Sequence, residues 1–256
     1  MNRYGAGIDS GSSFCKGALA GGRGVQALFT LPAGWDIAET GARMLAEIRK
    51  AAGSDRDGEL PVAATGYGRG QIAGCTGTLS EISAHAAGVE YLSPGARTVI
   101  DIGGQDCKVI TMERGSVREF QMNDRCAAGS GRFLELICAR LQADSVVMEA
   151  LLAEGRSVAL NSTCVVFAES EVIGLLARGV SREEILGGAA ASLAARIASL
   201  AARLPVAEPA VLSGGLAESQ GIAQALSRAL GIKVQPLRNG AYAGAIGAAL
   251  RAAAFP

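Results

Sequence analysis

Three things are scarce in this sequence: aromatic side chains, histidine and net charge. Aromatic residues make up 4% of the chain, histidine occurs once, and 24 basic residues balance 24 acidic ones. Without a net charge, no long-range field draws the chain to nucleic acid or to an anionic membrane, so a small ligand or a protein partner is favoured. Glycine, by contrast, is abundant, with 35 residues. Composition therefore favours an α/β protein in which helices pack closely on sheets.

The six cysteines form no C-x-x-C pair and are too sparse for a disulfide scaffold. We expect their thiols to be reduced or bound to metal. Residues 1–3 are not followed by the apolar region of a signal peptide, and the most apolar stretch, residues 187–202, is mostly alanine and contains Arg196. We therefore expect a soluble, cytoplasmic protein.

The strongest pattern is a nine-residue motif, I-D-x-G-x-x-x-C-K, that occurs at residues 8–16 and again at residues 100–108. Each copy stands between two short apolar runs and predicts a strand, a glycine turn and a second strand. One such copy alone is more often an ordinary glycine hairpin. Two copies with identical spacing favour a shared function.

Phosphate binding is the function that such hairpins suit. Glycine turns let backbone N–H groups approach phosphate oxygens, and Asp9 or Asp101 at the end of an incoming strand can orient hydrated Mg²⁺. Two opposed hairpins predict a clamp around one nucleotide. A third element, a buried strand ending in Gly-Gly at 210–215, precedes a predicted helix at 218–230. The chain has neither a P-loop nor a Rossmann fingerprint.

In this order the three elements resemble the phosphate 1, phosphate 2 and adenosine motifs of the acetate and sugar kinase, Hsp70 and actin superfamily. The resemblance implies a two-lobed α/β structure with a duplicated, ribonuclease H-like fold. We expect residues 1–92, completed by residues 238–256, to form the first lobe. Residues 93–237 would form the second.

Cys126 and Cys164 differ in setting from the other cysteines. Cys126 lies between polar residues and a glycine-rich stretch ahead of a predicted helix, and Cys164 follows the capping residues 161–163 ahead of another. A helix N-terminus stabilises a thiolate or an anionic cluster. Small buried cysteines are the common alternative. Two ligands cannot complete the four-thiolate shell of a [4Fe–4S] cluster, but a two-fold axis makes four of them.

The remaining cysteines have simpler interpretations. Cys138 shares a predicted helical face with leucines, and Cys15 and Cys107 lie in predicted strands, so all three are expected in the core. Cys75 is expected in a loop. His85 is interpreted as a packed or capping residue, because no metal-ligating cluster surrounds it.

A second resemblance covers nearly the whole chain. The strings GIDSGSSFCK, ATGYGRG, VIDIGGQDCKVI, QMNDRCAAGSGRFLE, STCVVFAESEV, LSGGLAES and YAGAIGAAL are similar to those of the activators of 2-hydroxyglutaryl-CoA dehydratase. These activators belong to the BadF/BadG/BcrA/BcrD-type ATPases. The resemblance implies an ATP-hydrolysing iron–sulfur protein that drives low-potential, single-electron transfer to a 2-hydroxyacyl-CoA dehydratase or a related reductase.

The same resemblance implies roles for individual residues. Cys126 and Cys164 of each subunit would ligate one [4Fe–4S] cluster shared by a homodimer, and Asp9 and Asp101 would hold hydrated Mg²⁺. Gln105 would position the attacking water, with Asp106 as the competing choice. The nucleotide, ATP or ADP, would contact a larger set: Ser12, Ser13, Phe14, Cys15, Lys16, Gly103, Gly104, Gln105, Asp106, Gly214, Gly215 and Tyr242, the last standing where the family often carries Gln.

Partners and alternatives follow from this interpretation. A dehydratase or reductase would accept the electron, and a ferredoxin or flavodoxin would donate it. No nucleic acid or membrane partner is expected. A small-molecule kinase built on the same ATPase core is the alternative function, and a nucleotide-sensing module without turnover is a third.

Overall fold

The structure is a computed structural model that describes residues 4–22, 24–53, 60–123, 127–161 and 164–254. The chain divides into two compact units. Unit 1 comprises residues 1–96, 112–118 and 238–256, and unit 2 comprises residues 97–111 and 119–237. Each unit is built around one five-stranded mixed sheet.

The sheet of unit 1 has the order β3-β2-β1-β4-β5. Strands β1 (Gly5–Ser10), β2 (Phe14–Gly21) and β3 (Gly24–Pro32) form an antiparallel meander, and β4 (Val62–Gly66) and β5 (Gly77–Thr78) continue it in parallel. Strand β1 is buried along its whole length, as expected for the centre of a sheet covered on both faces.

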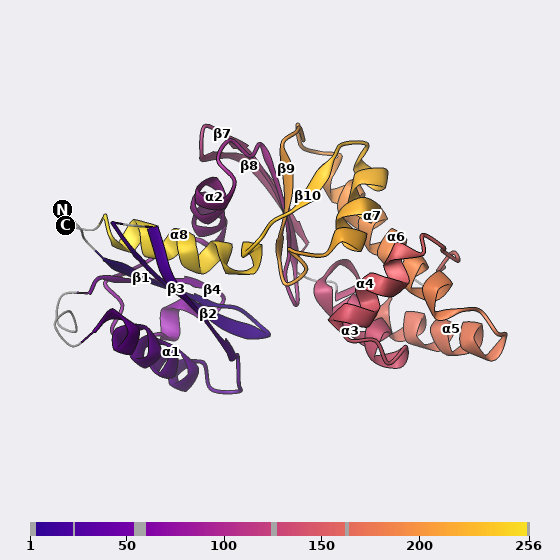
Figure 1. Ribbon diagram of the computed structural model, residues 1–256, viewed down its shortest axis with the longest axis horizontal. Helices are drawn as coiled ribbons and strands as arrows, with labels where there is room; N and C mark the ends of the chain where they lie inside the picture. The colour runs from indigo at the N-terminus through magenta and orange to yellow at the C-terminus, as the bar shows by residue number, and fades with distance from the viewer. Residues whose placement is uncertain (1–3, 23, 54–59, 124–126, 162–163, 255–256) are drawn as a thin grey trace. The chain divides into compact units, whose positions relative to one another are not determined.

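Helices cover both faces of this sheet (Figure 1). Helix α1 (Ile37–Ala52) packs Met44, Leu45 and Ile48 against one face. Helix α8 (Ala243–Ala252) lies on the other face, with α2 (Glu81–Leu92) packed against it.

The contact between β1 and α8 depends on glycine. A Cβ atom on Gly5 or Gly7 would collide with backbone atoms of Ala249 and Ala245 in α8. The bare strand surface lets the helix backbone come close, so side chains on this face of β1 lie directly beneath α8.

The sheet of unit 2 has the order β10-β9-β6-β7-β8. Strands β6 (Thr98–Ile102) and β7 (Cys107–Glu113) pair antiparallel, β8 (Ser116–Asn123) follows at the edge, and β9 (Ala210–Gly214) and β10 (Val234–Pro236) continue in parallel. Read from the meander side, this is the strand order of unit 1. The two units therefore share one sheet topology.

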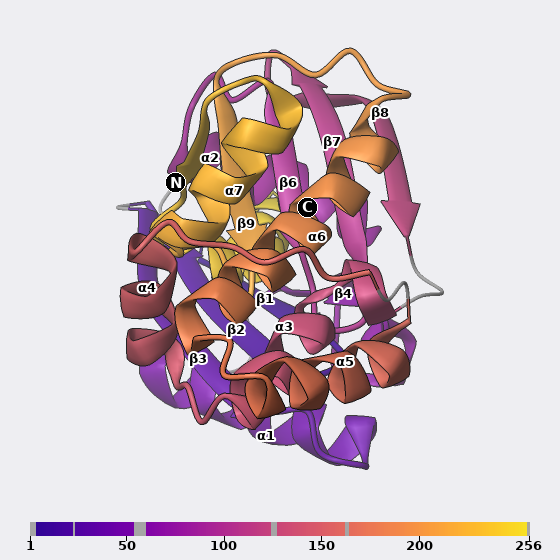
Figure 2. The same ribbon diagram turned by 90° about the vertical axis from the view of Figure 1, so that its right-hand side faces the viewer.

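The described part of unit 2 has five α-helices, which are labelled in Figure 2: α3 (Gly131–Arg140), α4 (Ser145–Ala153), α5 (Val165–Ala177), α6 (Arg182–Ala201) and α7 (Gln220–Leu230). Helix α6 is anchored by a capping box of Ser181 and Glu184. Within the described ranges, α6 alone is long and apolar enough to cross a membrane, but half of its apolar window is buried. A core helix of a soluble domain passes the same test.

In the described part of the chain, short 3-10 helices mark three connections: η2 (Arg69–Gln71), η3 (Ala127–Gly129) and η4 (Gly240–Tyr242). The predicted hairpins, the strand before Gly214-Gly215 and the helix after it are all confirmed.

Candidate nucleotide-binding hairpins and cluster helices

The two copies of the repeated motif form hairpins of the same backbone geometry. We call β1–β2 the first hairpin and β6–β7 the second hairpin. Gly11 N donates to Phe14 O at 3.2 Å in the first, and Gly103 N donates to Asp106 O at 3.0 Å in the second. In both, the aspartate of the incoming strand stands opposite the lysine of the outgoing strand. The repeat therefore places corresponding side chains at corresponding positions.

In the first hairpin the aspartate has an oxygen to spare. Asp9 is buried, yet its Oδ1 has no hydrogen-bond partner within the described ranges. Its neighbour across the parallel pair is Thr65, whose buried hydroxyl also lacks a partner there. Two unsatisfied buried oxygens side by side are uncommon and call for an explanation such as a water or an ion. Lys16, opposite Asp9, is half-buried.

Two glycines border the Asp9 carboxylate. A Cβ on Gly66 would lie 2.6 Å from Oδ1, and one on Gly244 would lie 2.5 Å from Oδ2. Gly66 also has φ near +85°, a conformation that favours glycine. Because both positions lack a side chain, the carboxylate keeps its place at the end of β1. Its oxygens fit as acceptors of hydrogen bonds from the water ligands of a hydrated Mg²⁺.

In the second hairpin the corresponding aspartate is fully engaged in ion pairs and hydrogen bonds. Lys108 Nζ lies 2.7 Å from Asp106 Oδ2 and 3.3 Å from Asp101 Oδ2, and Ser213 Oγ donates to Asp101 Oδ1 at 2.9 Å. Lys108 is only 1% exposed. Ser213 stands beside Asp101 in register as Thr65 stands beside Asp9. We call Asp101, Asp106, Lys108 and Ser213 the buried charge cluster.

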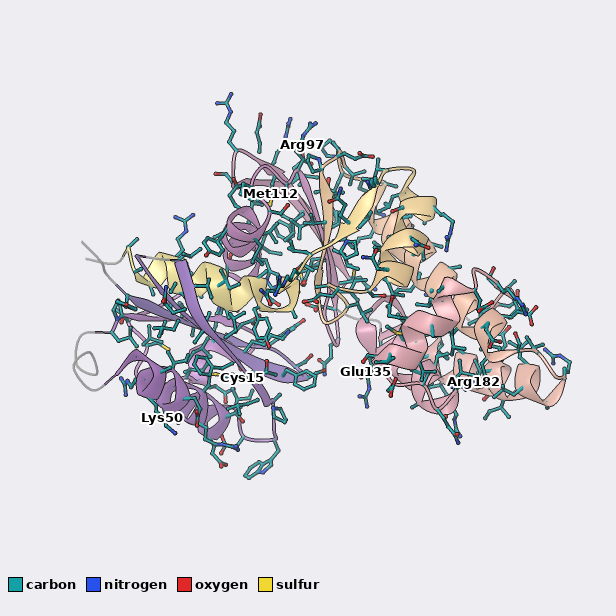
Figure 3. The ribbon with its side chains drawn as sticks, in the orientation of Figure 1. Cys15, Lys50, Arg97, Met112, Glu135 and Arg182 are labelled. Atoms are coloured by element: carbon teal, nitrogen blue, oxygen red, sulfur yellow. The ribbon has the colours of Figure 1, made fainter. Side chains whose placement is uncertain are left out.

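Most hairpin residues predicted to contact nucleotide are accessible, but Cys15 and Asp106 are buried. Ser12 and Gln105 are exposed, Phe14 is 46% exposed, and Ser13, Gly103 and Gly104 are half-buried. The thiol of Cys15, which is labelled in Figure 3, belongs to the core cluster of Met44 and Leu45. Burial, assisted by Asp9, raises the pKa of the Cys15 thiol to about 12. Cys15 can therefore offer a nucleotide its backbone but not a thiolate.

The remaining nucleotide candidates lie in different units. Gly214 is buried with φ near +84°, Gly215 is exposed, and Gly215 N donates to Ile102 O at 3.0 Å. Tyr242, in unit 1, accepts a hydrogen bond of 2.9 Å from Thr30 Oγ1 on β3.

The segment after Cys126 is bound to the turn of the second hairpin. Cys126 itself lies outside the described residues. Gly131 N donates to Gly103 O at 2.8 Å, Arg132 N donates to Gly104 O at 3.2 Å, and Ser130 Oγ lies 3.1 Å from Gly104 O. The start of α3 therefore rests on the turn that carries Gln105.

Cys164 is the N-cap residue of α5 and is exposed. The capping residue is thus the cysteine itself, without a side-chain cap bond; of residues 161–163, only Asn161 is within the described ranges. An exposed thiol beside the free N–H groups of a helix start fits a metal ligand. Among the described residues no group of three or more His, Cys, Asp or Glu could hold a metal.

Helices α3 and α5 are joined by packing and charge. Phe133 and Leu134 of α3 share the core cluster with Ala168 and Val172 of α5. Arg140 of α3 also forms an ion pair with Glu169 of α5. The helices that follow the two candidate cluster cysteines are therefore in direct contact.

The other cysteines and the histidine lie where sequence reasoning put them. Cys107 and Cys138 are buried, Cys75 is in a loop, and burial raises the pKa of all three thiols. His85 is buried in α2, and its Nδ1 lies 3.2 Å from Glu81 O.

Sequence reasoning missed four residues around the hairpins: Thr65, Lys108, Ser130 and Ser213. Lys108 was visible as a repeated letter of the motif. Thr65 and Ser213 are each followed by a glycine at the end of a buried strand, and this shared pattern was the available signal.

Comparison with known proteins agrees with these features. The model of the BadF/BadG/BcrA/BcrD ATPase family matches residues 6–252. The (R)-2-hydroxyglutaryl-CoA dehydratase activating ATPase of Acidaminococcus fermentans is 39% identical over 255 residues, covering 98% of each chain.

Two solved structures are similar over nearly the whole chain. Component A of (R)-2-hydroxyglutaryl-CoA dehydratase from Acidaminococcus fermentans has a TM-score of 0.91 at 38% identity and covers 98% of both chains. The activator of 2-hydroxyisocaproyl-CoA dehydratase from Clostridium difficile, with bound ADPNP, has a TM-score of 0.90 at 36% identity and covers 98% of this chain and 94% of that one.

More distant structures share the fold alone. The ROK hexokinase from Thermus thermophilus has a TM-score of 0.53 at 17% identity and covers 96% of this chain and 97% of its own. The predicted fold class is confirmed. The chain belongs to the BadF/BadG/BcrA/BcrD ATPase family, as its repeated hairpins and cysteine segments predicted.

Proposed function

We propose that this chain is an ATP-hydrolysing, iron–sulfur activator that passes one low-potential electron to a 2-hydroxyacyl-CoA dehydratase or a related reductase. The similar proteins with dehydratase-activator names, 38–40% identical over nearly the full length, support the ATPase and the class of acceptor. The acceptor would be a separate protein, and a reduced ferredoxin or flavodoxin would supply the electron in the cytoplasm.

The first and second hairpins would bind the phosphates through their turn N–H groups. Asp9 would hold water ligands of Mg²⁺, since its Oδ1 is buried without a partner in the described ranges. Bound Mg²⁺ would neutralise phosphate charge. Gln105, exposed at the tip of the second turn, would align the attacking water, because phosphoryl transfer asks a protein mainly for positioning and charge stabilisation.

Cys126 and Cys164 of two subunits would hold the [4Fe–4S] cluster, which would supply the one-electron carrier. The α5 surface beyond Cys164 suits a buried symmetric contact, because Val166 and Phe167 are 68% and 69% exposed. A homodimer would cover these side chains.

We infer that nucleotide binding is coupled to the helices that follow the cluster cysteines. The hydrogen bonds between the turn of the second hairpin and α3 support this coupling most directly. Gly103 O and Gly104 O accept from Gly131 N and Arg132 N, so a turn that closes on phosphate must carry the start of α3 with it. Helix α3 is paired to α5 through Arg140 and Glu169. Residues that follow both cluster cysteines would thus respond to the nucleotide.

Anaerobic purification tests the proposal. The wild-type chain should be a brown dimer with about four iron atoms per two chains. Cys164→Ala should remove iron, whereas the control Cys75→Ser should keep it. With a chemical reductant and Mg-ATP, the wild type should release phosphate and activate an added dehydratase. A colourless monomer that phosphorylates a metabolite would instead support the kinase, and nucleotide binding without phosphate release would support a sensing module.

A further inference from the structure

The two hairpins differ at one chemically decisive position. The seventh residue of the repeat is Phe14 in the first copy and Asp106 in the second, while the aspartate and the lysine around it are unchanged. Phe14 is 46% exposed, whereas Asp106 is buried. One copy therefore has two charged groups and the other has three.

The additional charge of Asp106 coincides with deeper burial of the lysine in the second copy. Lys108 is buried and touches both carboxylates, at 2.7 Å and 3.3 Å, whereas Lys16 is half-buried and no ion pair joins it to Asp9. A buried ammonium group is stable only when it is paired and hydrogen-bonded. Asp106 supplies the additional partner that Lys16 lacks.

We propose that Lys108 is a positioning residue and the resident cation of the second hairpin, and that the hydrated Mg²⁺ of the nucleotide is left to Asp9 and Thr65 of the first. This inference rests on the proposed function. It excludes Asp101, which the sequence predicts to hold the metal together with Asp9. It adds Thr65, whose hydroxyl oxygen would accept a hydrogen bond from one of the metal's water ligands.

The hydrogen bonds of Asp101 and Asp9 support this assignment of Lys108 to the second hairpin and of Mg²⁺ to the first. Both Asp101 oxygens are engaged, Oδ1 by Ser213 and Oδ2 by Lys108. Asp9 Oδ1 and Thr65 Oγ1, at the corresponding positions, have no partner within the described part of unit 1. A cation with its water shell would satisfy these two oxygens, whereas at Asp101 it would have to displace an ammonium group already in place.

Asp106 connects Lys108 to the turn. Its carboxylate lies over Gly103, where a Cβ atom would collide with Oδ1, and its backbone oxygen accepts the hydrogen bond of 3.0 Å that closes the turn. By fixing Asp106, Lys108 fixes the turn that presents Gln105 and that carries the start of α3. Loss of Lys108 should therefore slow hydrolysis more than it weakens nucleotide affinity.

Manganese binding to the ADP-loaded protein, followed by the EPR signal of free Mn²⁺, tests the metal assignment without measuring activity. Asp9→Asn should weaken Mn²⁺ binding at least ten-fold, and Thr65→Val should weaken it several-fold. Asp101→Asn and Lys108→Met should change it less than three-fold. An Asp101→Asn variant that loses Mn²⁺ as severely as Asp9→Asn would overturn the inference.

ATP hydrolysis tests the positioning role. Lys108→Met should lower kcat at least ten-fold and change the KM for ATP less than three-fold. Lys108→Gln, which keeps two donors on a neutral side chain, provides the same test should the methionine variant not fold. Unchanged kcat in a folded variant would overturn the positioning role. If the wild-type chain neither binds ADP with Mn²⁺ nor releases phosphate, the proposed function itself fails.

Discussion

The first and second hairpins share nine-residue spacing, strand pairing and turn closure, yet they differ in charge. In the first, a buried aspartate oxygen and a threonine hydroxyl have no partner in the described ranges. In the second, the corresponding aspartate is bound by a lysine and a serine inside a cluster of three charges. The difference shows that duplication can preserve a backbone while the charge contacts inside it change, with Phe14 in one copy and Asp106 in the other.

The largest expected difference is in the free energy of unfolding after replacement of Lys108 or of Lys16. Lys108→Met should lower the free energy of unfolding by about 3–5 kcal/mol, because it leaves two buried carboxylates without their cation. Lys16→Met, the matched change in the first hairpin, should cost less than about 1 kcal/mol. Denaturant unfolding of the nucleotide-free proteins measures both. Equal losses would mean that the hairpins do not differ in this way.

Loss of the hydroxyl group beside each aspartate should also destabilise the second hairpin more than the first. Ser213→Ala removes a hydrogen bond to a buried carboxylate and should cost about 1.5–3 kcal/mol. Thr65→Val removes a hydroxyl without a partner in the described part of the chain and should be neutral or slightly stabilising while no nucleotide is bound. The same unfolding experiment decides this, and a costly Thr65→Val would contradict the comparison.

Phe14→Asp tests whether the seventh residue causes the difference. The change gives the first hairpin the charge pattern of the second, so Lys16 should move toward the two carboxylates and away from bound phosphate. ADP affinity should fall up to about ten-fold, which corresponds to about 1.4 kcal/mol. Isothermal titration calorimetry measures the affinity. Phe14→Leu is the control, which should retain most of the affinity because no charge is added.

The smallest expected difference is in the thiol reactivity of Cys15 and Cys107, because neither should react with an alkylating reagent. Burial raises the pKa of Cys15 to about 12 and that of Cys107 above its ordinary value. At pH 8 the thiolate fraction of Cys15 is about one in 10⁴, and it rises only as the pH approaches 12. Iodoacetamide labelling of cluster-free protein, read by mass spectrometry, should modify the exposed Cys164 and leave Cys15 and Cys107 unmodified.

The hairpins were predictable because glycine turns and strand pairing are local properties, and a repeat doubles their signal. The burial of Lys108 was not predictable, because the repeat has a lysine at the same position in both copies. Only the three-dimensional neighbours distinguish Lys108 from Lys16. The correspondence of Thr65 with Ser213 was also hidden. Among the described residues, one α-helix separates β3 from β4, whereas four α-helices separate β8 from β9. The spacing between the hairpin and the strand that carries Thr65 or Ser213 is therefore not conserved between the units.

The cysteine segments were read correctly in part. The helix after Cys164 was predicted from its apolar pattern, but the hydrogen bonds from α3 to the second turn were not. They join residues 103–104 to residues 130–132 through backbone atoms, which leave no side-chain signature in a sequence.

Helix α8 is synthesised after every strand of both sheets, yet it covers β1 and brings Gly244 against the carboxylate of Asp9. During translation, this face of the first sheet stays uncovered until α8 has left the ribosome. The carboxylate of Asp9 therefore acquires its final surroundings only when residues 243–252 have docked on the sheet.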